Sequence, residues 1–549
     1  MSMALTQLLR KAAQEAPQRA ALRQDARMWT FAQLQDGAAR LASDLRALGV
    51  CDGQRVGMLA PNGIHYAAFM WGTWWAGGVI NPVNVRWSAA EVAYSLDDSD
   101  TQILLVDDPF VALAEQARSL SQSLRHLVYC GPGEAPATWL RLSWDDDGNS
   151  HREHDPWVEG VPPTTPEADT RSDGWAQRLP MADVERSGDQ LAMIMYTGGT
   201  TGKPKGVMLS HTNLYVATLG SMAMAPRPMY GTALVVAPMF HIAALGTSLR
   251  MLRNQSQQVF LQGFDEAAVL EAIAQHRITD MFLVPTMIRR LIEHPDFKQH
   301  DTSSMRSITY GAAAIDPTLL ERAMAAFPQA QFCQAFGMTE LSPTITMLTP
   351  EQHLPGPKRN QRLRSAGQPL PIAEVRVVNA DEQVCGVGEV GEICARGPMV
   401  MMGYWKQPEL TAQALRGGWM HTGDLGYFDA DGFLTVVDRL KDMVITGGEN
   451  VYSAEVERVV TQLAQVSQCA IIGVPDPRWG ERVHAVIVPR EGHTVSLADI
   501  DAHCRQHLAA YKCPRSLELR DALPLSAAGK VLKNVLRAPH WQHQASGVA

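Results

Sequence analysis

Residues 191–211 read LAMIMYTGGTTGKPKGVMLSH, and this stretch decides how the rest of the chain is interpreted. An apolar, strand-like run gives way to glycine and threonine residues, and Lys203 and Lys205 then flank Pro204. A loop of glycine and threonine leaves its backbone N–H groups unobstructed, and clusters of such groups bind anions. The two lysines add positive charge where phosphate oxygens would lie. The stretch therefore predicts a phosphate-binding loop.

The loop does not match the Walker A pattern GxxxxGK[ST] of P-loop proteins. Only three residues separate Gly198 from the Gly202–Lys203 pair, and Pro204 follows the lysine. Proline offers neither a backbone N–H nor the hydroxyl that a P-loop places on magnesium. We therefore expect the phosphate to be held by a different architecture.

Outward from this loop, the sequence alternates between helical and strand-like patterns. A helical pattern over 31–49 precedes strand-like runs at 55–61 and 101–108, and similar runs follow the loop up to residue 340. This rhythm predicts an α/β fold with parallel strands. Because ligands of open α/β sheets bind beyond the carboxyl ends of the strands, we expect the chemistry at the ends of these runs.

The pattern changes near residue 438, which predicts two domains, 1–438 and 439–549. The second is expected to be a small α+β unit, with one helix capped by Ser453 and another opened by Ser496 and Asp499 at capping-box spacing. Residues 131–180 are rich in Pro, Gly, Asp and Glu without periodicity, so we expect a long surface excursion there.

Composition argues against a nucleic-acid-coating protein, a disulfide-linked protein and a membrane-spanning protein. The net charge of −9 disfavours a surface that coats nucleic acid. None of the eight cysteines forms a CxxC pair, which is typical of reduced thiols. The apolar run over 67–80 is shorter than the roughly 20 residues that span a bilayer. We therefore expect a cytoplasmic protein without a transmembrane segment or nucleic-acid partner, and a homodimer stays open.

Further motifs accompany the loop in a fixed order. They are APMFH at 237–241, GAA at 311–313, QAFGMTE at 334–340, TGDLG at 422–426, DRLKD at 438–442, GGENVYS at 447–453 and PLSAAGKVLK at 524–533. With YTGGTTGKPKGV, this set resembles the adenylate-forming superfamily, in its acyl-CoA synthetase and aryl-CoA ligase branch. The resemblance implies a large layered α/β domain and a small mobile C-terminal domain. It also implies that ATP activates a carboxylic acid as an acyl-adenylate, which coenzyme A (CoA) then converts to a thioester.

The resemblance assigns the ATP site residue by residue. Thr339 would bind the α-phosphate, and Glu340 would bind Mg²⁺ together with Thr200. Asp424 would bind the ribose, and Arg439 would donate to the ribose or a phosphate. The adenine would lie against Gly311, Ala312, Ala313, Phe336 and Gly337, although many relatives carry Tyr where this chain has Phe336. The phosphate loop itself comprises Thr197, Gly198, Gly199, Thr200, Thr201, Gly202, Lys203 and Lys205.

The resemblance also assigns the second domain a moving role. Lys530 would contact the reacting groups during adenylation, and rotation about Lys441 would exchange it for the loop at Gly447 and Gly448, which lines the CoA tunnel. Trp479, Arg515 and Tyr511 match positions near the nucleotide end of CoA in some relatives, although packing is the simpler role for Tyr511.

His241 matches the family's gate residue beside the acyl pocket. The residues expected around it are apolar: Ile242, Ala243, Ala244, Leu245, Tyr310, Ala335 and Phe336. This favours a fatty or aromatic acid over an amino acid, whose ammonium would need an acidic partner.

Three alternatives stay open. An acyl-AMP ligase would load a carrier protein instead of CoA, although the nineteen residues after Lys530 leave no room for an attached carrier domain. A luciferase-like oxygenase and a non-catalytic nucleotide-binding regulator are the others, and the presence of Lys530, Glu340 and Asp424 disfavours the regulator.

Overall fold

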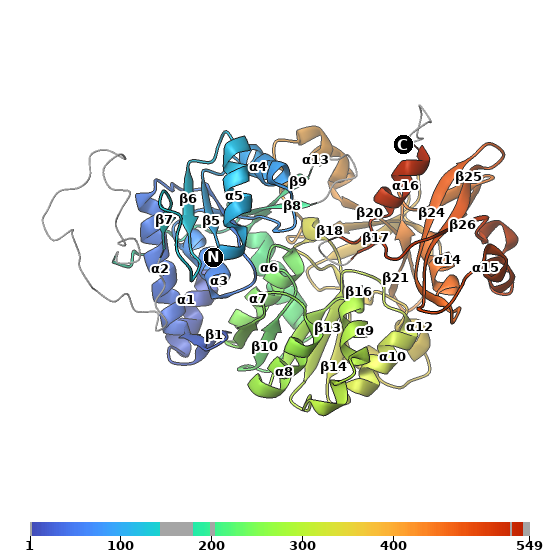
Figure 1. Cartoon of the computed structure of the whole chain (residues 1–549), viewed down its shortest axis with the longest axis horizontal. Helices are drawn as coiled ribbons and strands as arrows, with labels where there is room; N and C mark the ends of the chain where they lie inside the picture. Colours follow the sequence, from blue (N-terminus) through green and yellow to red (C-terminus); the bar gives the residue numbers. More distant parts are fainter. Residues whose placement is uncertain (1–2, 143–178, 198–203, 527–529, 542–549) are drawn as a thin grey trace, which may run out of the picture.

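The computed structural model describes residues 3–142, 179–197, 204–526 and 530–541, which form four β-sheets and their covering helices (Figure 1). Two large sheets and a small antiparallel sheet make up the body, and the fourth sheet lies at the C-terminal end of the molecule (Figure 1). The α/β class and the multi-sheet architecture predicted from the sequence are confirmed.

The first large sheet carries the phosphate-loop motif. Its described strands, in spatial order, are β19 (Gly403–Tyr404), β9 (Lys205–Ser210), β8 (Leu191–Thr197), β4 (Val79–Pro82), β3 (Arg55–Leu59), β5 (Ile103–Val106), β6 (His126–Tyr129) and β7 (Leu140–Arg141). Strands β8, β4, β3, β5, β6 and β7 pair in parallel, whereas β8 and β9 form an antiparallel pair. The phosphate motif therefore joins two paired strands.

The second large sheet carries the other nucleotide motifs. Its described strands, in spatial order, are β16 (Gln368–Pro369), β15 (Thr346–Leu348), β14 (Gln331–Phe336), β13 (Ser307–Gly311), β12 (Asp280–Leu283), β10 (Thr232–Val235), β11 (Gln257–Phe260), β1 (Ala20–Gln24) and β2 (Arg27–Thr30). The strands from β14 through β11 run parallel, so β13 and β14 end side by side at Gly311 and Phe336. The expected gathering of motifs at strand ends is confirmed for these two strands.

Helices cover the sheets of the body (Figure 1). Those described there are α1 (Thr6–Glu15), α2 (Phe31–Ala47), α3 (Ile64–Trp75), α4 (Ala89–Asp98), α5 (Val111–Leu120), α6 (His211–Met224), α7 (Ile242–Arg253), α8 (Glu266–His276), α9 (Pro285–Glu293), α10 (Pro317–Ala326), α11 (Pro350–His353), α12 (Arg359–Arg362) and α13 (Pro408–Ala414). Local chemistry sets their ends. A capping box between Thr30 and Gln33 begins α2, and Gly49 at φ 89° follows its end.

The small antiparallel sheet was not predicted from the strand pattern. It consists of β17 (Glu374–Val378), β18 (Gly391–Arg396), β20 (Met420–Phe428) and β21 (Leu434–Arg439). The register of β20 and β21 places Asp424 directly opposite Arg439. Two residues that lie apart in the sequence are thus neighbours where this sheet meets the C-terminal elements.

The C-terminal elements form a separate sheet with its own helices. The described strands are β22 (Val444–Thr446), β23 (Glu449–Val451), β24 (Val466–Asp476), β25 (Gly480–Pro489) and β26 (Ser516–Leu519), and the helices are α14 (Ser453–Val460), α15 (Leu497–Cys504) and α16 (Lys533–Trp541). The capping box of Ser496 and Asp499 is confirmed at the start of α15. We call residues 439–541 the lid; the boundary at residue 438 stays a prediction.

The predicted cap at Ser453 is wrong. Tyr452 is the residue before α14, and Ser453 is the first helical residue. The backbone N–H and the hydroxyl of Ser453 instead donate to the carboxylate of Asp438, with the hydroxyl 2.8 Å from Oδ2. Ser453 therefore joins the lid to the end of β21.

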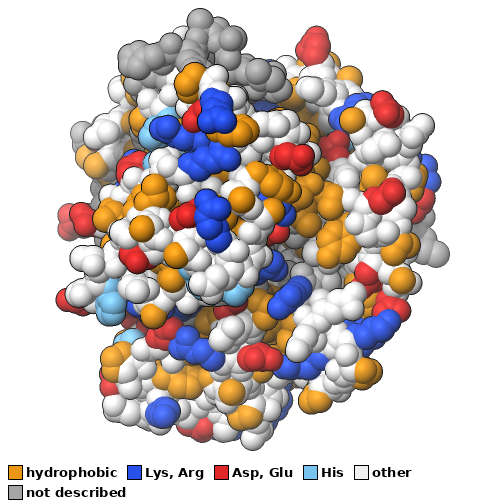
Figure 2. Space-filling model, turned by 90° about the vertical axis from the view of Figure 1, so that its right-hand side faces the viewer, with side chains coloured by type: hydrophobic (Ala, Val, Ile, Leu, Met, Phe, Trp, Pro, Cys, Tyr) orange, Lys and Arg blue, Asp and Glu red, His pale blue; other side chains and the backbone are white. Residues whose placement is uncertain are grey.

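Two further sequence predictions concern the surface. In the described part of the chain, no helix is long and apolar enough to cross a membrane. On the face shown in Figure 2, lysines and arginines are interspersed with acidic side chains and do not form a continuous positive face. Of the excursion at 131–180, residues 143–178 lie outside the described residues, while Leu140–Arg141 pairs with β6.

Candidate active site

The phosphate loop lies between two paired residues. Thr197 at the end of β8 is opposite Lys205 at the start of β9. Gly198, Gly199, Thr200, Thr201, Gly202 and Lys203 are outside the described residues. The antiparallel pairing nevertheless fixes where the loop leaves and re-enters the sheet, and Lys205 stands at that point. Its Nζ lies 5.4 Å from the centre of the Tyr404 ring, on the neighbouring strand β19.

Glu340 is a buried carboxylate with one strong partner. It lies in the short 3₁₀ turn Thr339–Leu341, 6% exposed, and its Oε1 accepts a hydrogen bond of 2.9 Å from the Tyr404 hydroxyl. Burial raises the pKa of Glu340, and the Asp424 charge acts in the same direction, while the Tyr404 hydrogen bond and Lys205 oppose it. A buried carboxylate is stabilised by cations, so Glu340 suits a position that faces positive charge.

Asp424 lies beside Arg439 at the joint between body and lid. The Arg439 Nε is 3.5 Å from Asp424 Oδ1, and the side chain of Asp424 is 16% exposed. Burial raises the pKa of Asp424, while the charges of Arg439, Lys530 and Lys441 lower it. An ionised carboxylate here is an acceptor of the kind that a ribose diol requires.

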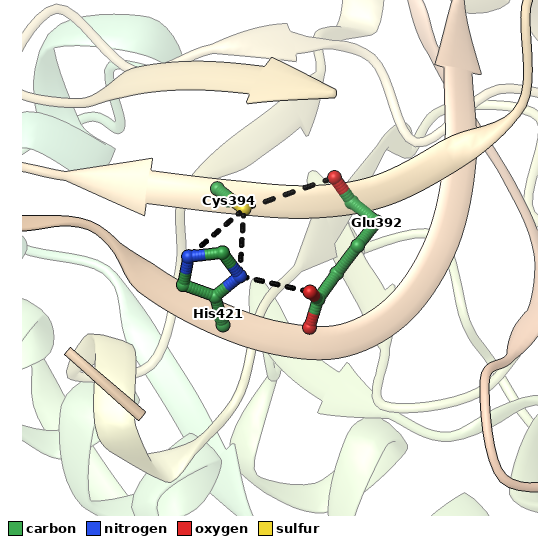
Figure 3. A group of neighbouring side chains, drawn as sticks. All are labelled: Glu392, Cys394 and His421. Atoms are coloured by element: carbon green, nitrogen blue, oxygen red, sulfur yellow. Dashed lines mark hydrogen bonds and ion pairs between the residues drawn. The ribbon is translucent and has the colours of Figure 1, made fainter. Parts of the chain in front are cut away.

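A neighbouring strand holds the turn that carries Asp424. Glu392, Cys394 and His421 lie together on β18 and β20 (Figure 3). Glu392 accepts hydrogen bonds from the backbone N–H of Gly423, at 3.0 Å, and from Arg416, at 2.9 Å, and it lies 2.8 Å from Nδ1 of the buried His421. This network fixes the backbone immediately before Asp424, and its role here is positioning.

The lid places Lys530 at these carboxylates. Leu525 and Val531 form an antiparallel backbone bridge, and the Lys530 N–H donates to Ser526 Oγ at 3.1 Å. Burial and the Arg439 charge lower the pKa of Lys530 to about 8, against the opposing effect of Asp424 and Glu340. Lys530 is therefore within electrostatic reach of both carboxylates, as the family resemblance predicts for an adenylating arrangement.

Lys441, the predicted pivot, lies in the same electrostatic environment. Partial burial and the Arg439 charge lower its pKa, and Asp424 raises it. Its backbone carbonyl accepts a hydrogen bond of 2.6 Å from Arg537 in α16. The joint is thus held by the last helix of the lid, a contact that the sequence did not indicate.

The predicted adenine slot is tightly built. A Cβ on Gly311 would lie 2.2 Å from the Ala335 carbonyl oxygen, and one on Gly337 would lie 2.0 Å from that of Pro343. Ala312 has a φ of 64°, and Ala313 is exposed. Phe336 is half-buried at the end of β14. Packing alone explains both glycines, so the adenine role of this slot stays a prediction.

His241 begins α7 and has a buried Nε2 with no hydrogen-bond partner in the described part of the chain. Burial lowers its pKa to about 4, with smaller contributions from Arg86 and Lys530. The imidazole is therefore neutral at pH 7. Beside it lies an apolar wall around Ala312, formed by Ala237, Ala243, Ala244, Phe282, Val284 and Met287.

Tyr310 does not belong to this wall. It is 0% exposed within the core of the second large sheet, and its hydroxyl lies 2.9 Å from His353 Nε2. Because side chains alternate along a strand, Tyr310 points to the face of β13 opposite Gly311. The expectation that it lines the acyl pocket is wrong.

The predicted CoA residues form a second group, in the lid. Gly447 has a φ of 62°, its N–H donates to the Trp479 carbonyl at 2.8 Å, and a Cβ there would lie 2.7 Å from the Trp479 ring. Guanidinium groups of Arg478 and Arg515 lie 4.7 and 4.5 Å from the centre of that ring. Gly448, at φ 85°, has open space around its Cα, whereas Tyr511 packs against the lid core.

Sequence reasoning missed several residues of the site. The Tyr404 hydroxyl donates to Glu340, and Glu392 accepts from the N–H of Gly423. The Arg86 charge helps to lower the pKa of His241, and Arg537 donates to the carbonyl of Lys441. None of them lies in a motif that the sequence singled out. Only strand pairing and the lid helix bring them to the site.

Replacing Tyr404 by Phe removes the hydrogen bond to Glu340 without changing the shape of the ring. Hydrogen bonds to charged groups are worth about 1.5–3 kcal/mol, so we expect kcat/KM for ATP to fall by about tenfold or more. The matched control is Tyr129→Phe. Tyr129 lies on β6, and its hydroxyl donates to the carboxylate of Asp108. Equal losses in the two variants would contradict a specific role for Tyr404.

The lowered pKa of Lys530 gives a pH dependence. Its ammonium form is the one that stabilises negative charge, and that form is lost as pH rises through about 8. We expect kcat/KM for ATP, which reports the free enzyme, to decline above this pH. Lys530→Arg keeps its charge throughout and should give a lower but level profile. The same decline in both proteins would contradict the assignment.

Comparisons with known proteins agree with this geometry. The sequence profile of a family described as "AMP-binding enzyme" matches residues 9–405, and that of the "AMP-binding enzyme C-terminal domain" matches residues 455–530.

Among characterised relatives, a feruloyl-CoA synthase of Amycolatopsis sp is 37% identical over 530 residues, covering 96% of each chain. A fatty acid–[acyl-carrier-protein] ligase, ScoC, of Streptomyces coeruleorubidus is 32% identical over 540 residues, covering 98% of this chain and 96% of that protein. Among solved structures, ATP-bound MatB from Rhodopseudomonas palustris superposes with a TM-score of 0.84 at 28% identity, covering 99% of both chains.

Proposed function

The chain belongs to the AMP-binding enzyme family, and from that premise we propose that it is an ATP-dependent acid–thiol ligase of the AMP-forming acyl-CoA synthetase type. It adenylates a fatty or aromatic carboxylic acid, with release of pyrophosphate, and then transfers the acyl group to CoA. The observation that carries the proposal is the position of Lys530, on the lid, within electrostatic range of Asp424 and Glu340 of the body.

The first half-reaction must bring two anions together. A substrate carboxylate oxygen forms a bond to the α-phosphorus of ATP while the bond to pyrophosphate breaks. Lys205, Arg439, Lys441 and Lys530 surround this place with positive charge. Fixed charges aimed at the developing negative charge are the largest single contribution in such reactions. Thr339 and the loop from Thr197 to Lys205 would hold the phosphates, and Asp424 the ribose.

Magnesium fits the donor set at Glu340. Its Oε1 is occupied by Tyr404, and the buried carboxylate still needs positive charge. Mg²⁺ prefers oxygen ligands and shares them with substrate phosphates. Glu340 would hold the ion with Thr200, where it would neutralise phosphate charge. The protein residues alone set the position of the carboxylate.

The second half-reaction requires Lys530 to leave. We propose that the lid turns about Lys441, which brings the Gly447–Gly448 loop to the body. The CoA thiol then attacks the acyl carbon and AMP departs. Trp479, between the guanidinium groups of Arg478 and Arg515, offers a flat cationic surface for the nucleotide end of CoA. This motion separates the two steps in one active site.

The acid is best sought among aromatic ones. The wall around Ala312 is apolar, and the neutral His241 cannot pair with a second charge on the substrate. A 37% identical relative is named for feruloyl-CoA, so ferulate and related aryl acids are the first substrates to test, followed by fatty acids. Acid-dependent pyrophosphate release that yields a thioester only in the presence of CoA supports the proposal.

The carrier-protein alternative is favoured by the similarity to ScoC. Acid-dependent pyrophosphate release without a CoA thioester, together with acylation of a phosphopantetheinylated carrier protein, would select it. We also propose that the protein is cytoplasmic. Whether it forms a homodimer is to be tested by sedimentation.

Replacing Lys530 by Ala separates the half-reactions. We expect acyl-adenylate formation, measured as pyrophosphate release, to fall by about a hundredfold to a thousandfold. Thioester formation from supplied acyl-adenylate and CoA should change little. Equal losses in the two assays would reject this role for the lysine.

Gly447→Ala tests the proposed CoA site on the lid, formed by the Gly447–Gly448 loop and Trp479. A Cβ at this positive φ must displace the Trp479 ring, so we expect KM for CoA to rise about tenfold while adenylation is preserved. Gly492→Ala is the matched control, since Gly492 has a φ of 74° in the same domain with open space for a Cβ. An unchanged KM for CoA in Gly447→Ala, or the same rise in the control, would count against this site.

A further inference from the structure

Three side chains meet on the lid without any role in the proposed reaction. His484 comes from β25, Glu518 from β26 and His540 from α16. Strands β25 and β26 pair in parallel with His484 opposite Ser516, so Glu518, two residues further along, lies on the same face. Glu518 Oε2 is 3.8 Å from His484 Nε2 and 3.8 Å from His540 Nε2. One donor atom from each residue lies within 4.8 Å of the others.

The inner histidine has an unsatisfied atom that points into this group. His484 is 6% exposed, and its Nδ1 lies 2.7 Å from the Ser516 hydroxyl. Its Nε2 is buried and has no hydrogen-bond partner within the described ranges. A buried polar atom without a partner is costly. The arrangement therefore indicates a missing partner located between His484, Glu518 and His540.

The chemistry of the group selects a cation. When Nδ1–H donates to Ser516, the free lone pair lies on Nε2, which is the form that binds metals. Glu518 Oε1 accepts from Arg520 Nε at 2.5 Å, and Oε2 is left facing both imidazoles. The nearby positive charge of Arg482 opposes a cation, and the Glu518 carboxylate offsets it.

We propose that His484, Glu518 and His540 form a Zn²⁺ site that ties helix α16 to the lid sheet. Two histidines and one carboxylate make a common protein ligand set for Zn²⁺, with the fourth position left for water. Bonds of about 2.0–2.1 Å hold tetrahedral ligands about 3.3 Å apart, so Glu518 needs to approach each histidine by about half an ångström, and the two histidines, whose donor atoms lie within 4.8 Å of each other, also need to move together. The His540 side chain is 31% exposed and has room to make this movement.

The described residues contain one other group that could hold a metal ion, and the carboxylate of that group is less free to bind one. At Glu392, Cys394 and His421, both carboxylate oxygens already accept hydrogen bonds, Oε1 from the Gly423 N–H and Oε2 from Arg416. The Glu518 carboxylate is bonded to Arg520 through Oε1 only, and its Oε2 faces the two imidazoles. We therefore assign the ion to the lid group alone.

The position of the site gives the ion a mechanical consequence. Lys530 lies in the segment between Glu518 and His540. Helix α16 is already fixed to the lid by Lys533, 2.7 Å from Glu457, and to the joint by Arg537 at the Lys441 carbonyl. An ion bound by both Glu518 and His540 would link the two ends of the stretch of sequence that contains Lys530. This consequence rests on the proposed function, whereas the binding itself does not.

The test uses the full-length, tag-free chain after treatment with a chelator and dialysis. Zn²⁺ is titrated by calorimetry without ATP or acid, and Co²⁺ is added to a separate metal-free sample to observe the visible absorption of a low-coordinate site. We expect one ion per chain. His540→Asn and Glu518→Gln should each weaken binding by about a hundredfold and should abolish the Co²⁺ spectrum.

Two matched variants serve as controls. His493→Asn removes an exposed histidine of the lid, and His507→Asn breaks the His503–His507 pair, whose ring centres are 4.8 Å apart on and beside α15. Both should bind as the parent does. Absence of Zn²⁺ binding in the parent, binding that survives His540→Asn, or binding lost in His507→Asn would each overturn the proposal. Hydrogen exchange across 530–541 should slow on Zn²⁺ addition in the parent and in neither ligand variant.

Discussion

Two buried carboxylates among several cations are the constraint on which the rest of this structure depends. Asp424 lies in strand β20 and Glu340 in the 3₁₀ turn Thr339–Leu341, and burial opposes the charge on each. Lys205, Arg439, Lys441 and Lys530 lie within electrostatic range of one or both carboxylates, and burial together with the Arg439 charge lowers the pKa values of Lys441 and Lys530. Burial destabilises the charged forms of both the carboxylates and the lysines when their partners of opposite charge are absent. A site with this excess of cations is complementary to a triphosphate, whose binding supplies the negative charge that the protein lacks.

The same constraint explains why the chain needs a lid. Lys530 completes the cluster only because a separate sheet carries it there, and β21 leads directly into that sheet. Ser453 bonds to Asp438, and Arg537 bonds to the carbonyl of Lys441, so the joint is held from the lid side by two contacts. A rotation of the lid would either break these two hydrogen bonds or move both partners of each bond together. Ser453 and Arg537 are therefore the residues at which a movement of the lid is first expected to change a contact.

Much of this could be predicted from the sequence, because glycine, proline and small polar residues mark the ends of buried strands. The parallel strands and the capping box of α15 follow from such signals, and the family motifs predict that Lys530, Asp424 and Glu340 serve one site. Contacts set by strand register could not be predicted. Tyr404 reaches Glu340 only because β19 pairs with β9, and Tyr310 faces the core because of its place on β13. The lid triad likewise needs the pairing of β25 with β26.

The most direct test of the cation cluster's purpose follows one oxygen atom. Ferulate, or the aryl or fatty acid found to be the best substrate, is labelled with ¹⁸O in its carboxylate and converted with ATP and CoA, and AMP is analysed by mass spectrometry. Attack of the carboxylate on the α-phosphorus predicts one ¹⁸O atom in each AMP. Unlabelled AMP, or ADP with labelled phosphate, would contradict the account, because the cluster would then not serve adenylation.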